Sequence, residues 1–386
     1  MDKPVVSTPL LLSEIQLRGL TAKNRIMVSP MCQYTSVDGG ATDFHLVHLG
    51  QFALGGAGIV FCEETSVADI GRKTHHCAGL YDAAHVAAYR KINRFLHEQG
   101  ALAGIQLGHA GRKASSREPW HGFQGLDAAD ADAGLVPWQA VAPSAVAQPG
   151  YPGLPHELTR QEIAEHVGQW RRAALLAAEA DYDIVEVHAA HGYLLHQFLS
   201  PLANQRRDAY GGSLEGRMRL CLEVVEAVRQ AWPADRPVFA RLSATDGEGS
   251  GWEMEDTLAL ARALKERGVD CITPSSGGIK GPTAVSVVAR SPGYHVPYAR
   301  RIRQDAGIAT IAVGLVTEAR QAEAILRAGE ADLIALAREL LWDPYWPAHA
   351  ARALGYERYL DLLPSSYGWW LARREQIRAL SGATGH

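Results

Sequence analysis

Eight short apolar segments rich in β-branched residues recur along the chain, and segments with helical spacing of apolar residues separate most of them. The predicted strands cover residues 24–31, 58–67, 102–111, 184–192, 238–246, 269–278, 310–317 and 331–340. The predicted helices cover residues 45–55, 83–99, 160–180, 214–232, 254–267, 296–305, 318–328 and 345–354. Thr159 is a candidate helix cap, and Gly100, Gly268 and Gly329 follow predicted helix ends.

Strands that are apolar on both faces indicate a parallel sheet covered by helices. Eight strand-then-helix units are the number that closes a barrel, so the sequence predicts an α/β protein with a (β/α)8 (TIM) barrel. The alternative is an open doubly wound sheet, but no Gly-x-Gly-x-x-Gly motif opens a helix after the first strand. We expect the whole chain, residues 1–386, to form one domain.

Two segments depart from this repeat. Residues 112–156, between strand three and its helix, are rich in Pro, Gly, Ala, Asp and Trp, and we expect them to form a cap over the barrel mouth. Residues 355–386 form a carboxyl-terminal tail that contains Trp369 and Trp370. The tail either packs on its own barrel or reaches a neighbouring subunit.

The overall composition is that of an ordinary globular protein. The chain has 386 residues, 47% of them hydrophobic, and a net charge of −4, which argues against a nucleic-acid or anionic-membrane partner. No apolar segment approaches the ~18 residues of a membrane span, and residues 1–17 do not resemble a signal peptide. Five dispersed cysteines without a Cys-x-x-Cys motif argue against a metal cluster and predict a reducing, cytoplasmic location.

In a barrel of this kind the chemistry lies at the carboxyl ends of the strands. The fourth predicted strand ends in His188 and His191, and Tyr193 follows. Two imidazoles and a phenol suit an enzyme that holds a carbonyl oxygen and supplies a proton. The same histidines could instead bind zinc together with Glu186 or His109, as in barrel metallohydrolases.

Other strand ends carry groups suited to a large polar ligand. Gln106 and Arg241 suit the polar edge of a heterocycle. Gly314, Ala337 and Arg338 end the seventh and eighth strands, where small residues and a guanidinium suit a phosphate.

Taken in order, these residues resemble the Old Yellow Enzyme family of flavoproteins, in its bacterial ene-reductase branch with a cysteine near the flavin. The resemblance covers about residues 11–371. It is carried by Pro-Met-Cys-Gln-Tyr at 30–34, Gln106 within 105–113, His-Ala-Ala-His-Gly-Tyr at 188–193, and the motifs at 200–204, 210–213, 338–341 and 343–347.

The resemblance implies a bound FMN, NADPH or NADH as reductant, and ping-pong hydride transfer to the activated C=C bond of an α,β-unsaturated carbonyl compound. The residues implied to lie along the flavin are Ser29, Pro30, Met31, Cys32 and the backbone of Glu64. Gln106 and Arg241 are implied to bind its pyrimidine edge, and Gly314, Ala337 and Arg338 its phosphate.

Three further roles follow from the resemblance. Tyr34, His188 and His191 are implied to contact the substrate, and Tyr193 to be the proton donor. Trp370 is implied to reach the active site of a neighbouring subunit in a homodimer or homotetramer.

The chain departs from the family pattern at Glu64, where the branch usually has a small residue, and at Ala337, which replaces a frequent glycine. A third departure is Gly216, in place of a usual asparagine. Two alternatives to an ene-reductase stay open: a zinc-dependent barrel hydrolase that uses His188 and His191, and a non-catalytic flavin-binding protein.

Overall fold

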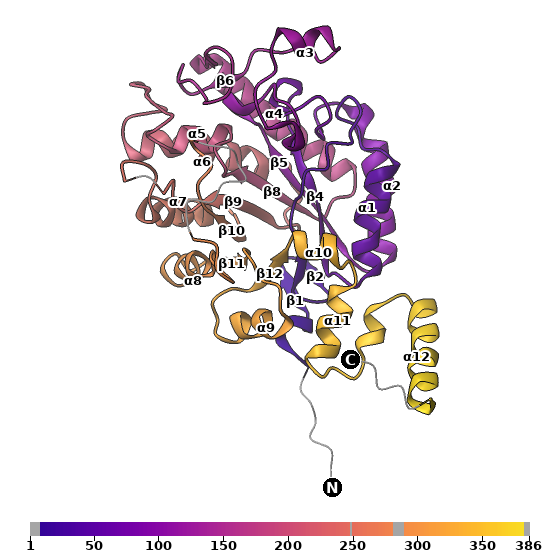
Figure 1. Cartoon of the computed structure of the whole chain (residues 1–386). Coiled ribbons are helices and arrows are strands. Elements are labelled where there is room, and N and C mark those ends of the chain that lie inside the picture. The colour runs from indigo at the N-terminus through magenta and orange to yellow at the C-terminus, as the bar shows by residue number, and fades with distance from the viewer. Residues whose placement is uncertain (1–7, 248, 281–288, 382–386) are drawn as a thin grey trace.

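Eight parallel strands close into a barrel in the computed structural model, which describes residues 8–247, 249–280 and 289–381 (Figure 1). The strands follow the order β10-β11-β12-β3-β4-β5-β8-β9 around the barrel. They are β3 (Ile26–Val28), β4 (Ile59–Ser66), β5 (Leu102–Gly108), β8 (Ile184–Ala189), β9 (Val238–Ser243), β10 (Cys271–Ser275), β11 (Ala309–Ala312) and β12 (Leu333–Leu336). Each overlaps one of the eight predicted segments, so the predicted barrel is confirmed.

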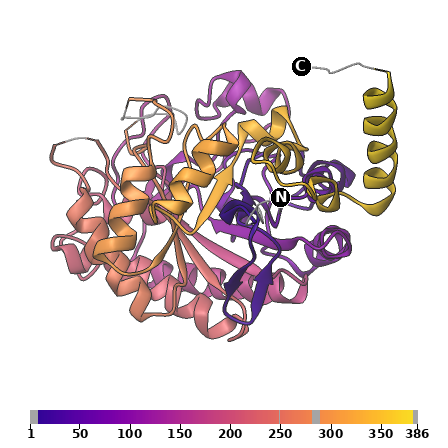
Figure 2. The same cartoon turned by 90° about the horizontal axis from the view of Figure 1, so that it is seen from below.

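The eight predicted helices are also present and cover the outside of the barrel (Figures 1 and 2). They are α1 (Asp43–Leu54), α2 (Val86–Glu98), α4 (Arg160–Glu179), α6 (Leu214–Ala231), α7 (Met254–Glu266), α8 (Val296–Asp305), α9 (Ala319–Arg327) and α11 (Trp346–Ala353). The Thr159 side chain accepts a hydrogen bond from the Glu162 N–H and caps α4, as predicted. Gly100, Gly268 and Gly329 have φ values of 70°, 83° and 66°, the left-handed conformation that favours glycine after a helix.

Four helices were not predicted: α3 (Ala128–Asp132), α5 (Leu194–Leu199), α10 (Arg338–Trp342) and α12 (Ser365–Leu380). The first three have five or six residues, too few for a helical period to show in the sequence. The longer α12 consists mostly of good helix-forming residues and begins directly after Pro364.

The alternation of side chains along the strands points polar groups into the barrel. On β8, Ile184 belongs to the inner core, whereas Val185 and Val187 pack in the outer core against the helices. Because side chains two apart on a strand share a face, Glu186 and His188 lie on the inner face with Ile184. The hairpin of β1 (Ile15–Leu17) and β2 (Leu20–Ala22) packs Leu17 and Ala22 against this inner core near the amino ends of the strands.

Residues 112–156 contain secondary structure of their own. After β5 they include α3 and the strand β6 (Val141–Ala142), which pairs with β7 (His156–Glu157). Trp138 and Ala140 from this segment pack against a small cluster formed by Ala110, Ala114 and Tyr193. The segment therefore touches the end of β8 that carries the histidines.

The carboxyl-terminal helix α12 stands away from the barrel in both views (Figures 1 and 2). Trp369 and Trp370 on this helix are 55% and 67% exposed. The predicted domain, 1–386, and tail, 355–386, extend past the described residues, since 1–7, 248, 281–288 and 382–386 lie outside them. Among the described helices none is both long and apolar enough to cross a membrane.

Candidate active site

The end of β8 gathers the three residues predicted to carry the chemistry. The ring centroids of His188 and His191 are 5.1 Å apart, and those of His188 and Tyr193 are also 5.1 Å apart. His191 and Gly192 have φ values of 61° and 73°, so the chain turns sharply here through two left-handed residues. For a histidine this conformation stores strain, which the surrounding structure must hold in place.

The hydrogen bonds around the two histidines define which ring nitrogens carry protons. The Ala190 N–H donates to His188 Nδ1 at 3.3 Å, so the His188 proton is on Nε2. His188 Nε2 lies 3.3 Å from His191 Nδ1, which therefore accepts. The remaining nitrogen, His191 Nε2, carries its proton and donates to Ser275 Oγ at 2.7 Å.

Both histidines are neutral at pH 7. Burial lowers the pKa of His188 and of His191 well below the ordinary value, and the charge of nearby Arg241 lowers both further. A neutral pair can donate hydrogen bonds to an oxygen without carrying a buried charge of its own.

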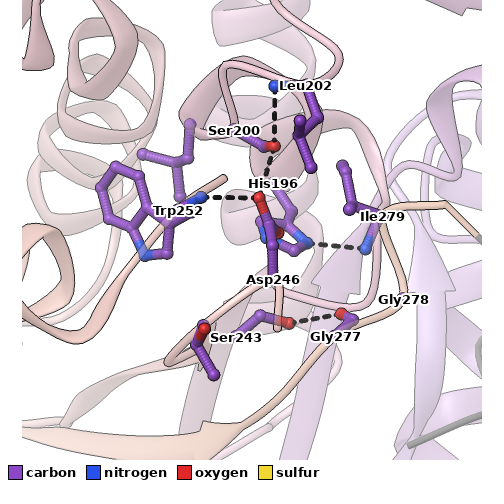
Figure 3. Close-up of polar contacts among 12 residues, drawn as sticks. His196, Ser200, Leu202, Ser243, Asp246, Trp252, Gly277, Gly278 and Ile279 are labelled. Atoms are coloured by element: carbon purple, nitrogen blue, oxygen red, sulfur yellow. Dashed lines mark hydrogen bonds and ion pairs between the residues drawn. The ribbon is translucent and has the colours of Figure 1, made fainter. Parts of the chain in front are cut away.

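A second layer of buried polar groups supports the turn (Figure 3). The Gly192 N–H donates to His196 Nδ1 at 2.8 Å, so Nε2 carries the His196 proton and faces Asp246 Oδ1 at 2.9 Å. Asp246 Oδ2 accepts from Ser200 Oγ at 2.6 Å and from the Trp252 N–H at 2.7 Å. This network ties the turn between His191 and Tyr193 to the segment that follows β9.

The His196–Asp246 network was not predicted. His196 follows His188 and His191 in one short segment, and Asp246 ends the fifth predicted strand, so both residues carried a positional signal. Their pairing depends on the loops that bring α5 and the end of β9 together, which the local sequence does not describe.

A cavity of about 510 Å³ lies beside the histidines. Six of the ten residues predicted to bind the cofactor line it: Ser29, Pro30, Arg241, Gly314, Ala337 and Arg338. His191 and Ser275 line it as well, and so do Arg290, Tyr294 and His295, which the sequence did not single out.

Two features of this cavity suit a large anionic ligand. Arg241 donates from Nη1 to Ser29 Oγ at 3.1 Å, but its buried Nε has no hydrogen-bond partner in the described part of the chain. Gly314 has a φ of 105°, and a Cβ on it would come within 3.1 Å of the Tyr294 ring. Glycine at this position therefore keeps one wall of the cavity open.

The other four predicted cofactor residues do not line this cavity: Met31, Cys32, Glu64 and Gln106. Gln106 is buried and donates from Nε2 to Glu186 Oε1 at 2.7 Å. Burial raises the pKa of Glu186 above its ordinary value, although the positive charge of nearby Arg241 offsets part of the increase. Burial likewise raises the pKa of the Cys32 thiol above its ordinary value, so Cys32 is protonated at neutral pH.

Glu64 forms a buried ion pair with Lys73. The Lys73 Nζ lies 5.4 Å from the centroid of the Tyr193 ring. Burial alone lowers the pKa of Lys73, but the negative charge of the paired Glu64 carboxylate helps to raise it well above its ordinary value. The Glu64 carboxylate is thus paired with an ammonium group that the sequence did not single out.

Tyr34 and Trp370 lie in different surroundings. Tyr34 packs edge-on against Trp120 of the 112–156 segment, with ring centroids 5.5 Å apart, and burial raises the pKa of its phenol. Trp370 lines an apolar groove of about 460 Å³ between α11 and α12, formed with Tyr345, Tyr359 and Leu363 among others. Trp370 does not line the 510 Å³ cavity of its own protomer.

The geometry does not favour the zinc hydrolase. Within the described ranges, no three His, Cys, Asp or Glu side chains are grouped so that they could hold a metal ion. His188 and His191 instead bond to each other and to Ser275.

The chain is a (β/α)8 barrel with a ligand-sized cavity at its strand ends. A neutral histidine pair and a tyrosine stand beside this arginine-lined cavity, which is the arrangement of a barrel enzyme that binds its ligand at the carboxyl ends of the strands. Residues 11–357 match the model of the NADH:flavin oxidoreductase / NADH oxidase family. The chain belongs to this family and is an oxidoreductase of the Old Yellow Enzyme type, with FMN as cofactor and a reduced nicotinamide as reductant.

Relatives named NADPH dehydrogenase match over nearly their whole length. A protein named NADPH dehydrogenase from Listeria monocytogenes is 44% identical over 347 residues, which is 89% of this chain and 95% of the relative. A Geobacillus protein of the same name is 42% identical over 90% of this chain and 95% of its own.

Solved structures agree with the fold. Morphinone reductase is 28% identical, with a TM-score of 0.72 over 90% of this chain and 91% of its own. The Old Yellow Enzyme homologue of Zymomonas mobilis is 25% identical, with a TM-score of 0.73 over 89% of this chain and 93% of its own.

The residues of the 510 Å³ cavity fit FMN. Arg241, Arg290 and Arg338 line it, against a single acidic side chain, Glu339, among the described residues. Such a donor set suits a phosphate, and the unpartnered Nε of Arg241 offers a buried donor to a polar heterocycle edge.

Proposed function

We propose that the protein reduces the activated C=C bond of α,β-unsaturated carbonyl compounds in a ping-pong cycle, with NADPH or NADH as the first substrate. The observation that carries this proposal is that a neutral histidine pair and a tyrosine lie close together at one edge of an arginine-lined cavity. Bound FMN would supply the redox chemistry, which is hydride transfer from the nicotinamide to the alkene. The relatives named NADPH dehydrogenase support NADPH as the reductant.

In this proposal different residues of the chain bind different parts of the FMN. Arg338, with the backbone at Gly314 and Ala337, holds the phosphate, and Arg241 and Gln106 bind the pyrimidine edge. Ser29, Pro30, Met31, Cys32 and the Glu64 backbone lie along the ring system. The presence of six of these residues around one cavity supports the assignment.

His188 and His191 bind the carbonyl oxygen of the substrate, and the His188 Nε2–H turns from His191 Nδ1 to this oxygen when the substrate enters. His191 Nε2 donates to Ser275 Oγ, and both residues line the cavity, so a carbonyl oxygen there can replace the hydroxyl as acceptor. The neutral rings stabilise negative charge that develops on the oxygen by hydrogen bonding, as oxyanion donors do. Tyr34 contributes a further contact to the substrate.

Tyr193 delivers the proton to Cα. A phenol is protonated at neutral pH, and the ring is held close to both histidines. The tie between Gly192, His196 and Asp246 keeps the donor oriented relative to the carbonyl-binding pair.

We propose that α12 completes a homo-oligomer and brings Trp370 to the active site of a neighbouring subunit. Its support is a helix that stands away from its own barrel with two exposed tryptophans. Trp370→Ala is expected to raise KM for a bulky enone more than it changes flavin content, and sedimentation is expected to give a dimer or tetramer. A monomer at working concentration with unaltered kinetics would contradict this assignment.

The visible spectrum of the purified protein tests the proposed function. We expect flavin bands that bleach anaerobically on addition of NADPH and return when cyclohexenone is added. A colourless protein would contradict flavin dependence. Flavin bands that bleach but do not return with cyclohexenone would contradict enone reduction, and bands that never bleach would favour a binding protein.

A further inference from the structure

A second cavity, of about 300 Å³, lies beside Tyr193 on the side of the 112–156 segment. Lys73, Lys113 and Tyr193 line it, and Phe123, Gln148 and others from the 112–156 segment complete its wall. No acidic side chain of the described residues lines it. The amino groups of two lysines therefore border a small chamber that adjoins the proposed proton donor.

Lys113 is anchored to backbone carbonyl groups of two other segments. Its Nζ donates to His191 O at 2.9 Å and also to Gly278 O, and it lies 5.8 Å from the centroid of the Tyr193 ring. Burial, together with the nearby charge of Arg112, lowers the pKa of Lys113 to about 7. An ammonium group that is costly to desolvate gains when an anion enters beside it.

Lys73 faces the same tyrosine and is already matched by Glu64. Glu64 does not line the chamber, whereas Lys73 does. The ion pair with Lys73 holds the Glu64 carboxylate outside the chamber, so its negative charge does not repel an anion there.

The wall of the chamber also contains a buried polar group without a partner. Gln148 is 4% exposed, and its Oε1 has no hydrogen-bond partner within the described chain. Rotation of the amide by half a turn exchanges Oε1 for Nε2, so Gln148 can accept from a hydroxyl or donate to an oxygen. A purely apolar substrate would leave this group unsatisfied, which costs free energy.

We infer that this chamber is a subsite for a carboxylate carried by the unsaturated substrate, with Lys113 as the group that binds it and Gln148 as a second contact. The inference rests on the proposed function and specifies its substrate class. Tyr193 protonates Cα and also borders the chamber, so a side chain on Cα is the one best placed to enter it. A charge-assisted hydrogen bond to Lys113 then selects the acid over its neutral ester.

The test compares two substrates that differ only in charge. They are cyclohexenone with a propanoate side chain on carbon 2 and the methyl ester of the same compound, reduced by the FMN-loaded full-length protein. We expect Lys113→Met to lower the ratio of kcat/KM for the acid to kcat/KM for the ester by about 10- to 100-fold. Lys113→Arg, which keeps the charge, is expected to retain most of the ratio.

Lys91→Met is the matched control, because Lys91 lies on the outer surface of α2 and pairs with Asp43. Its ratio is expected to equal that of the wild type. An equal ratio in Lys113→Met and in the wild type would overturn the subsite. Failure of the wild type to reduce the acid, the ester and cyclohexenone itself would overturn the proposed function instead.

A binding measurement covers the case in which Lys113→Met does not fold. The probe is the saturated acid, 3-(2-oxocyclohexyl)propanoate, added to the wild type at pH 8 in two buffers with different ionisation enthalpies. Arg112, His191, Tyr193 and the Lys73–Glu64 pair surround Lys113, and a carboxylate beside it should raise its pKa. We expect uptake of most of one proton with the acid and none with the ester; binding of the acid without proton uptake would overturn the inference.

Discussion

The two cavities on either side of the histidine–tyrosine turn are built differently. The 510 Å³ cavity is formed largely by residues at or just after strand ends, such as Ser29, Arg241, Gly314 and Arg338. The 300 Å³ chamber is formed by loops, mainly the 112–156 segment, which includes Lys113, together with Lys73 and Tyr193. Strand ends are fixed by the barrel itself, whereas loops can change without altering the fold. We therefore expect the first cavity to bind the cofactor that the family shares and the second to select the substrate.

The largest expected effect is at Tyr193, which joins the two cavities. Tyr193→Phe keeps the ring and removes the proton, so flavin reduction by NADPH should stay near the wild-type rate in stopped-flow measurements. Reoxidation by cyclohexenone should slow by about 10²–10⁴-fold, as for a lost general acid. Slower flavin reduction together with normal enone turnover would show that the acid role is wrong.

Arg338 tests the strand-end cavity alone. Arg338→Ala removes a charge-assisted contact to the phosphate and should raise the dissociation constant of FMN by about 10- to 100-fold, measured by fluorescence titration of the apoprotein. Arg94→Ala, on the exposed face of α2, is the control and should bind FMN as the wild type does. Unchanged affinity in Arg338→Ala would place the phosphate elsewhere.

Asp246 supports the turn before Tyr193 through His196. Burial alone raises the pKa of Asp246, but His196, Ser200 and the Trp252 N–H together lower it below its ordinary value. A carboxylate with a lowered folded pKa stabilises the fold above its unfolded pKa, near 4, and this contribution is lost as the pH falls through the folded value.

Asp246→Asn should therefore lower the free energy of unfolding by about 1–2 kcal/mol at pH 7 and by less below pH 4, measured by urea denaturation. Asp305→Asn, at a surface pair with Arg301, is the control and should change little. A difference that stays constant down to pH 3 would mean that the carboxylate charge contributes nothing.

The smallest expected effect is at Glu64. If its carboxylate lies near the flavin, Glu64→Ala leaves Lys73 as an unmatched positive charge and should raise the FMN midpoint potential modestly. The double variant Glu64→Ala/Lys73→Met removes both charges of the pair, so its potential should return toward that of the wild type. Equal potentials in all three proteins would mean that the pair acts on the loop-built chamber and not on the flavin.

The eightfold alternation of strands and helices, and with it the barrel, could be predicted from the sequence. Apolar periodicity and helix caps such as Thr159 are local signals, and they agree with the structure along the whole barrel. The grouping of Ser29, Arg241, Gly314 and Arg338 could also be predicted, because parallel strands of a barrel end at one face.

Only the tertiary structure decided which groups meet beside Tyr193. Lys73 and Lys113 are far from Tyr193 in sequence and approach it through loops whose conformations follow from packing over the barrel mouth. Lys73 pairs there with Glu64 on β4. The same holds for His196 and Asp246, which two different βα loops bring within 2.9 Å. Local patterns determine which segments form strands and helices, whereas charges on loops are paired by long-range contacts that leave no period in the sequence.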